Sequence, residues 1–226
     1  MRLLAVETSG KACSAALYQG ETLLGELYGD TGLTHSEKLL PFIDRLMEAC
    51  EMEPKELDAL AVSIGPGSFT GLRIGVASMQ GVGQALSIPI APVPSLRALA
   101  YGGRAFPGIV CPMMDARRNH VYTALYREGQ EILAPTPLSM EALLEVLFPY
   151  GEAVYFLGDG VPLHREVLGQ QLPVARFALP ALMLPRASWV GAVALEENHF
   201  LSPAQMDIQY LRASQAERLR QEREDA

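Results

Sequence analysis

Two acidic residues at the tips of expected β-hairpins are the side chains with the clearest potential for chemistry. Glu7 precedes a turn that contains Thr8, Ser9 and Gly10, and Asp115 precedes a second turn. The backbone amides and hydroxyls of such a turn can hold phosphate oxygens, while the carboxylate can hold Mg²⁺ or its water shell. Thr8, Ser9 and Gly10 are therefore candidate phosphate or nucleotide contacts. The alternative is an ordinary surface turn.

The second turn is less suited to phosphate than the first. Ala116, Arg117 and Arg118 stand where glycine or hydroxyl residues would let a phosphate approach. We therefore expect no cofactor on this chain alone, and ATP with Mg²⁺ at most at the level of a larger complex. The alternative function is an ATP-dependent kinase or carbamoyl-type transferase that uses Glu7 and Asp115 around Mg²⁺.

A glycine-rich run, Gly-Pro-Gly-Ser-Phe-Thr-Gly at residues 65–71, joins an expected strand to an expected helix. Backbone amides at a helix N-terminus can bind an anion. The run is not a Walker loop, because no Lys-Ser/Thr pair ends it, and the next strand is not followed by the acidic residue of a dinucleotide fold. The glycines can instead permit a tight turn and close helix packing. We expect Ser68 to be a helix-entry residue and not a nucleophile.

The sequence indicates neither a metal site nor a catalytic residue. The four histidines are scattered, and Leu39 lies one helical turn after His35, so no H-x-x-x-H pair exists. The three cysteines lack C-x-x-C spacing, which argues against a zinc site and a disulfide framework. A glycoprotease-type metallopeptidase is therefore the least favoured function.

An uncharged helix is the strongest sign of a binding partner. Residues 74–86 contain no charged residue, although a helix on one side of a sheet normally keeps a solvated face. Apolar and small residues recur there at spacings of three and four, as in helices that pack side by side, and the preceding helix has a similar stripe. We expect this pair to form an interface with a second subunit; the alternative is that the helices pack only on each other and on their own sheet. The expected interface residues are Leu39, Leu40, Ile43, Leu46, Met47, Cys50, Leu72, Gly75, Val76, Met79, Gly83 and Leu86.

The expected elements divide the chain into two similar lobes. Each lobe opens with a strand, a polar turn and a second strand, and the triplets Ala16-Leu17-Tyr18 and Ala124-Leu125-Tyr126 lie at equal distances from Glu7 and Asp115. We interpret this similarity as a duplication. The first lobe covers residues 1–104, with strands expected at 3–6, 12–18, 22–27, 60–64 and 88–93 and helices at 34–52 and 71–86, and the smaller second lobe covers 105–226 with a charged tail at 215–226.

Composition and charge restrict the function further. Hydrophobic residues make up 49% of the chain and charged residues 19%, which is typical of a globular protein. The net charge of -8 predicts weak binding of nucleic acid by this chain alone, so any RNA role would be shared with a basic partner. No segment resembles a signal peptide or a membrane span, and the cysteines fit a reducing compartment, so we expect a cytoplasmic protein without membrane contact.

Several motifs together resemble the TsaB family, formerly called YeaZ. They are Glu7-Thr8-Ser9, His35-Ser36-Glu37, Leu39-Leu40-Pro41, residues 65–75, Asp115-Ala116-Arg117 and Tyr210-Leu211-Arg212. The run at residues 65–75 is the most specific of these, and the resemblance covers essentially the whole chain. Glu7 departs from the family, whose members commonly have Asp there, and the longer side chain weakens the case for a metal or phosphate role of the turn.

The resemblance implies an α/β fold with two duplicated mixed-sheet lobes, like those of actin, Hsp70 and sugar kinases (the ASKHA, RNase H-like class). It also implies a non-catalytic subunit of the bacterial machinery that makes threonylcarbamoyladenosine in tRNA. Such a subunit would bind the catalytic subunit TsaD through the helix pair, act with the ATPase TsaE, form homodimers through the same surface and meet tRNA through the complex. TsaD binds metal through an H-x-x-x-H pair, and Leu39 stands where the second histidine would fall.

Overall fold

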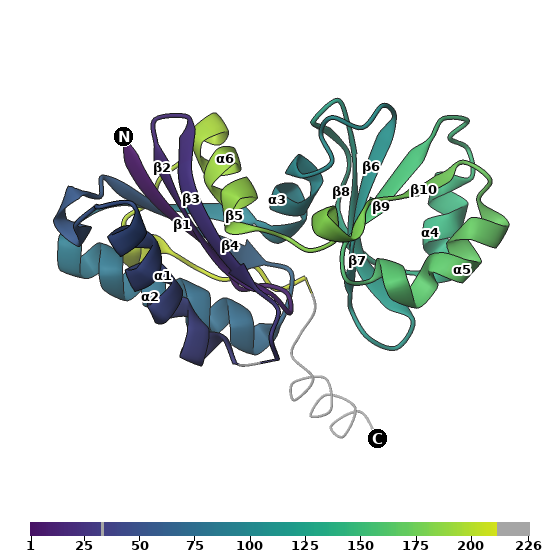
Figure 1. The fold of residues 1–226 in the computed structure, drawn as a ribbon. Coiled ribbons are helices and arrows are strands. Elements are labelled where there is room, and N and C mark those ends of the chain that lie inside the picture. Colours follow the sequence, from purple (N-terminus) through teal and green to yellow (C-terminus); the bar gives the residue numbers. More distant parts are fainter. Residues whose placement is uncertain (33, 212–226) are drawn as a thin grey trace, which may run out of the picture.

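The computed structural model describes residues 1–32 and 34–211, which form two lobes, each built around a five-stranded mixed sheet (Figure 1). The expected charged tail at residues 215–226 and the last residue of the Tyr210-Leu211-Arg212 motif lie outside the described residues.

The first sheet has the strand order β3-β2-β1-β4-β5. The first three strands in the chain are antiparallel, while β1, β4 and β5 are parallel. Most residues of β1, β2 and β4 are buried, because helices cover both faces of the sheet. The strands are β1 (Arg2–Glu7), β2 (Cys13–Gln19), β3 (Thr22–Gly29), β4 (Ala59–Gly65) and β5 (Ile90–Pro94).

Helices α1 (His35–Ala49) and α2 (Phe69–Leu86) cover one face of this sheet, and α6 (Ala187–Glu197) covers the other (Figure 1). The expected capping box at the start of α1 is confirmed, since the Thr34 backbone amide donates to the Glu37 carboxylate over 3.0 Å. Apolar residues of both helices pack on the sheet in one core.

The second sheet repeats the arrangement of the first, with the order β10-β9-β6-β7-β8. Helices α4 (Met140–Leu147) and α5 (Val161–Gln171) pack on one face, and α3 (Ser95–Tyr101), which links the lobes, packs on the other. Read in the opposite direction, from β8 to β10, each strand takes the place of its counterpart in the first sheet, as the expected duplication requires. The strands are β6 (Ile109–Asp115), β7 (His120–Arg127), β8 (Gln130–Ser139), β9 (Val154–Leu157) and β10 (Ala175–Phe177), and 3-10 turns lie at Pro54–Glu56, Pro180–Leu182 and Pro203–Gln205.

The chain returns to the first lobe after the second sheet, which corrects the expected second lobe of residues 105–226. Helix α6 is apolar on nearly all sides and is buried between the first sheet and α3. The segment after it pairs Leu201 with Ile90 at the sheet edge, and the Gln209 amide donates to the Ile64 carbonyl over 2.8 Å. Residues 187–211 therefore belong to the first lobe, because the back of its sheet would otherwise lie open to water.

Within the described part of the chain, no helix combines the length and hydrophobicity needed to cross a bilayer.

Candidate functional site

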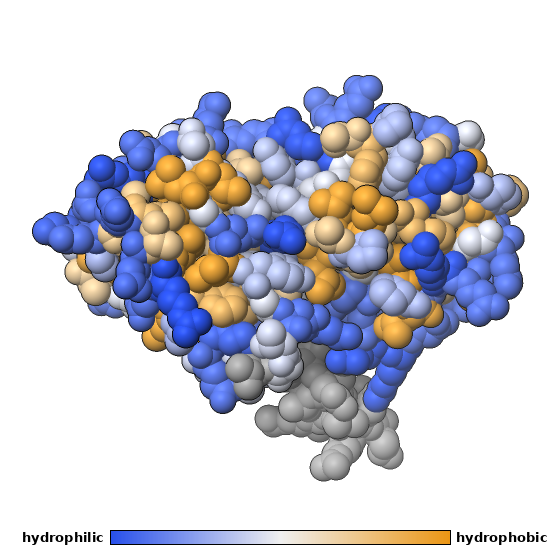
Figure 2. Space-filling model, viewed as in Figure 1, coloured by the Kyte–Doolittle hydropathy of each residue, from blue (hydrophilic) through white to orange (hydrophobic). Residues whose placement is uncertain are grey.

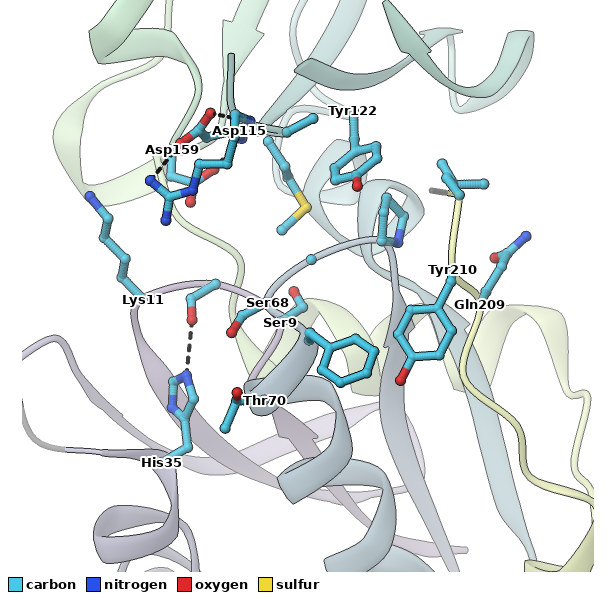
Figure 3. A pocket seen from close by; sticks show the side chains of 18 of the residues that line it. Ser9, Lys11, His35, Ser68, Thr70, Asp115, Tyr122, Asp159, Gln209 and Tyr210 are labelled. Carbon is cyan, nitrogen blue, oxygen red and sulfur yellow. Dashed lines mark hydrogen bonds and ion pairs between the residues drawn. The ribbon is translucent and has the colours of Figure 1, made fainter. Parts of the chain in front are cut away.

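A cavity of about 740 Å³ opens between the lobes, at the end where both hairpin turns lie (Figure 3). The first lobe lines it with Ser9, Gly10 and Lys11 of the β1–β2 turn and with residues 66–70 at the start of α2. The second lobe contributes Met114–Arg117 and Asp159. Gln209, Tyr210 and Leu211 complete the rim. The fold thus brings together the candidate turns that are about 100 residues apart in the sequence.

Glu7 does not face this cavity. The side chain is completely buried, and its two oxygens accept hydrogen bonds from the Ser9 backbone amide and the Ser63 hydroxyl. Burial raises the pKa of the Glu7 carboxyl above its ordinary value, although these hydrogen bonds oppose the shift. Glu7 therefore stabilises the β1–β2 turn from its buried side, away from the cavity.

The three expected phosphate contacts are separated by the structure. Ser9 and Gly10 line the cavity, but the buried Thr8 hydroxyl donates to the Gly71 carbonyl over 2.8 Å, so the expectation for Thr8 is wrong. This side chain therefore lies between the β1–β2 turn and α2. Ser9 is buried as well, and its side chain helps to oppose the rise in the pKa of the Glu7 carboxyl.

The glycine-rich run packs α2 tightly against the β1–β2 turn. A Cβ on Gly71 would overlap the Thr8 carbonyl oxygen, and a Cβ on Gly75 would overlap the Thr8 hydroxyl. A Cβ on Gly67 would overlap Ser9 in the same way. The interpretation that these glycines permit close packing is therefore confirmed. The expected role of Ser68 at the helix entry is also confirmed, because its hydroxyl accepts a hydrogen bond from the Gly71 amide over 3.2 Å.

The second-lobe wall of the cavity carries two carboxylates. Asp115 accepts from the Arg117 amide over 2.8 Å and forms an ion pair with the Arg117 guanidinium at 3.2 Å. Asp159 accepts from the Asp115 amide over 3.0 Å, and burial, together with the negative charge of Asp115, raises the pKa of its carboxyl. Sequence reasoning missed Asp159, although an acidic residue between Gly158 and Gly160 directly after a strand is a usable signal.

His35 is a structural residue of the turn. Its Nε2 lies 3.0 Å from the Gly10 carbonyl oxygen, and burial lowers the pKa of the imidazole, so the neutral form donates this bond. Leu39 is buried in the core one turn later. Within residues 1–32 and 34–211, no group of three potential metal ligands comes together.

The helix pair presents a different face from the one expected. Met79 is 0% exposed, and most of the expected interface residues pack into the core between the helices and their own sheet. Only Leu40, at 52%, is fully on the surface, while Cys50 and Leu86 are half-buried. The buried residues, for which the expectation of an outward face is wrong, are Leu39, Ile43, Leu46, Met47, Leu72, Gly75, Val76, Met79 and Gly83.

Beyond Arg73, which is exposed one turn before Ala77, the outer face of α2 is nevertheless free of charge. Ala77, Gly81, Gln84 and Ala85 are exposed, and no charged residue lies between Ile74 and Leu86. Apolar residues recur at the same spacing in a helix that packs on a sheet and in a helix that packs on another helix. The spacing in the sequence therefore could not show whether this stripe packs on its own sheet or on a second subunit. The exposed residues of this face between Ile74 and Leu86 are uncharged, and Gln84 is a polar side chain among them.

Proteins of known structure share the architecture of this chain. The ROK hexokinase from Thermus thermophilus aligns with a TM-score of 0.51 over 87% of this chain and 100% of that one at 12% identity, a likeness of fold alone. It confirms the expected two-lobed, sugar-kinase-like fold. YeaZ from Pseudomonas aeruginosa aligns with a TM-score of 0.76 at 28% identity, over 93% of this chain and 99% of that one.

Sequence relationships are closer still. The profile of a family described as TsaD, tRNA N6-adenosine threonylcarbamoyltransferase, matches residues 30–199. The tRNA threonylcarbamoyladenosine biosynthesis protein TsaB of Bacillus subtilis is 34% identical over 226 residues, which cover 96% of this chain and 96% of that protein. This similarity confirms the resemblance, and the chain belongs to the TsaB family, also called YeaZ.

Proposed function

We propose that this protein is a scaffold subunit that binds a TsaD catalytic subunit during the synthesis of threonylcarbamoyladenosine in tRNA, in the cytoplasm. The name of the Bacillus subtilis relative supports a part in this biosynthesis. The TsaD family profile that matches most of the chain supports a common ancestry with the catalytic subunit. TsaE would join as a further partner, and tRNA would be met through the complex.

The observation that carries the proposal is the outer face of α2 between Ile74 and Leu86, which contains no charged residue. Ala77, Gly81 and Ala85 recur every fourth residue, so they form one ridge of small side chains that lets another backbone approach closely. A Cβ on Gly81 would meet no atom within 4 Å, which shows how open this ridge is. Leu40 on the neighbouring helix adds an exposed apolar side chain.

Hydrophobicity alone would not single out a docking face. The side of the molecule seen in Figure 2 carries separate hydrophobic patches on both lobes, with hydrophilic residues between them. A run of thirteen helical positions without a charge is the rarer feature, because exposed helix surfaces normally carry Lys, Arg, Glu or Asp.

The same face suits self-association. A twofold axis beside α2 would place the ridge of one copy against the same ridge of the second, as an isologous interface requires. A homodimer and a complex with TsaD would then use one surface and exclude each other. The positions of Glu7 and Asp115 favour the scaffold over the kinase alternative, because both carboxylates are engaged with their own turns.

A pair of glycine substitutions tests this proposal. Gly81→Arg places a charge in the middle of the α2 face, and Gly169→Arg places the same charge on α5 of the second lobe, where a Cβ also meets no atom within 4 Å. Both positions are helical and exposed, so neither substitution disturbs the core. Burying an unpaired charge in an interface costs about 3–5 kcal/mol, which weakens association more than about a hundredfold.

We expect Gly81→Arg to be monomeric by size-exclusion chromatography with light scattering, to lose co-purification with TsaD and to lose tRNA modification in the reconstituted system. Gly169→Arg should behave as the unmodified protein does in all three assays. Equal behaviour of the two variants would refute the assignment of this face. Full tRNA modification by TsaD and TsaE without this chain would refute the scaffold function itself.

A further inference from the structure

The two lobes meet through helix α3, which the chain forms on its way from the first sheet to the second (Figure 1). Ala98 belongs to the apolar core that contains α6, whereas Leu96 and Leu99 pack with the second sheet. Two lobes joined by short connecting segments can in general rotate about them as rigid bodies. Further contacts across the junction decide whether the lobes of this protein can do so.

Arg97 on α3 contacts both lobes with one side chain. Its Nε donates a hydrogen bond over 3.0 Å to Oε1 of Glu197, the last residue of α6 in the first lobe. Its Nη1 donates over 2.8 Å to the carbonyl of Gly129, in the turn between β7 and β8 of the second lobe. Because the donors of a planar guanidinium have fixed directions, these two bonds hold their acceptors in one relative position.

The first-lobe acceptors lie where negative charge is costly without a nearby arginine. Helix α6 ends with Glu196 and Glu197, and its last turn contains no basic residue. Negative side chains at a helix C-terminus oppose the helix dipole. Arg97 forms ion pairs with Glu196 at 3.9 Å and with Glu197 at 3.0 Å, and Arg104 pairs with Glu196 at 3.3 Å. The negative end of α6 is therefore neutralised from α3 and the residues that follow it.

The second-lobe acceptor lies in a tight turn. Arg127 and Gln130 are paired across the hairpin, so the turn consists of Glu128 and Gly129, which both have positive φ (51° and 79°). A two-residue turn of this kind matches the twist of its strands, so its carbonyl has little freedom to move. The Arg97 side chain is 19% exposed, and its charge is therefore screened less than that of a fully exposed residue.

The contacts of Arg97 lie at the end of the junction that is remote from the cavity. Strand β7 starts beside the turn that lines the cavity with Ala116 and Arg117, and it ends at the turn that contains Gly129. A rotation about α3 that widened or narrowed the cavity would move Gly129 relative to Glu197. Such a rotation would break at least one of the two hydrogen bonds.

We propose that Arg97 locks the two lobes at a fixed angle, so that the cavity between them keeps one width. One side chain on the connecting helix bonds the end of α6 and the β7–β8 turn at the same time. The protein then presents one rigid shape to its partners and does not open and close. This inference concerns the junction of the lobes and does not depend on the scaffold function.

Distances between spin labels on the two lobes, measured by double electron–electron resonance, test this lock. One label is attached at Glu21→Cys, in the exposed β2–β3 turn, and the other at Gly169→Cys, on the exposed side of α5. Cys50→Ser removes the half-buried native thiol, and Cys13 and Cys111 are buried. Dilution into unlabelled protein restricts the measured distances to one chain.

Three variants separate the lock from the rest of the junction. Arg97→Met keeps the apolar stem and loses every polar contact, and Arg97→Lys keeps the charge but lacks the fork that bonds both lobes. Arg104→Met is the matched control, because it also removes an ion pair with Glu196 but leaves the bond to the β7–β8 turn. A second label pair at Glu21→Cys and Asp30→Cys, on either side of β3, reports the first lobe alone.

We expect one narrow distribution of distances between the lobes in the unmodified protein and in Arg104→Met. In Arg97→Met and Arg97→Lys this distribution should broaden, or shift by more than its own width, while the pair within the first lobe stays unchanged. If Arg97→Met also alters the first-lobe pair, Arg97→Lys alone decides.

Three results would overturn the proposal. The first is an unchanged distribution in Arg97→Met, and the second is a broad distribution in the unmodified protein. The third is equal broadening by Arg104→Met, because the effect would then follow from the charge at the end of α6 and not from the bridge between the lobes.

Discussion

Two glycines of α2 should respond in opposite directions to the same substitution. Gly75 lies against the Thr8 hydroxyl, where an added methyl group has no room, whereas Gly81 faces open space on the same helix. Alanine is favoured over glycine inside a helix by about 1 kcal/mol. Gly81→Ala should therefore stabilise the protein by about 1 kcal/mol, since nothing opposes this gain.

At Gly75 the gain is outweighed. Room for the methyl group requires the Thr8 side chain to move, which breaks its 2.8 Å hydrogen bond to the Gly71 carbonyl. That loss of about 1 kcal/mol cancels the helix preference. The remaining overlap between the turn and the helix costs about 1–3 kcal/mol, because Thr8, which directly follows β1, is buried and cannot withdraw freely. Gly75→Ala should therefore destabilise the protein by about 1–3 kcal/mol.

Urea unfolding of the two variants and the unmodified protein measures this difference. Trp189 is the sole tryptophan and packs against Gly102, where α3 meets α6, so its fluorescence reports the junction of the lobes. Far-ultraviolet circular dichroism reports the helices, and agreement of the two signals supports the use of a single transition. Equal stability of Gly75→Ala and Gly81→Ala would refute the close contact between α2 and the β1–β2 turn.

Three further predictions concern buried groups. Because burial raises the pKa of Glu7 above 4.5, folding favours the protonated form of its carboxyl. The free energy of unfolding of the unmodified protein, compared with that of Glu7→Gln, should therefore fall as the pH rises from 4.5 towards the folded-state pKa of Glu7. The expected slope is up to about 1.4 kcal/mol per pH unit. Burial raises the pKa of Cys13 to about 11 and of Cys111 to about 12, so a thiol reagent should label only the half-buried Cys50 in the native protein and all three cysteines in urea. Val76→Arg should unfold the first lobe and not merely separate subunits, since the side chain is 3% exposed and a charge there costs at least about 4 kcal/mol.

Each of these predictions can be contradicted by a specific result. Chemical denaturation at a series of pH values would contradict the account of Glu7 if the difference between the two proteins stayed constant. Mass spectrometry of the labelled native protein would contradict the burial of Cys111 if that residue reacted as quickly as Cys50. A folded, monomeric Val76→Arg protein would contradict the assignment of α2 to the core and would restore the expectation that this stripe faces a partner.

The sequence by itself determined the local elements and their repetition. The Thr34–Glu37 capping box set the start of α1, and the polar turns after Glu7 and Asp115 marked equivalent hairpins in two lobes. The glycine-rich run marked a strand-to-helix turn, although α2 begins at Phe69, earlier than expected, because Ser68 caps it. These features are readable because residues a few positions apart determine them.

The tertiary structure alone decided which neighbour each side chain meets. A stripe of residues at spacings of three and four specifies a buried helix face, but the partner of that face, here the first sheet, lies in other parts of the chain. In the same way, the Ser63 hydroxyl donates a hydrogen bond to Glu7, and Asp159 lines the cavity beside the first turn. Helix α6 packs on the first lobe. All of these contacts join residues that are far apart in the sequence. Local periodicity is a property of one segment, whereas burial and the approach of two walls around a cavity depend on how distant segments pack together.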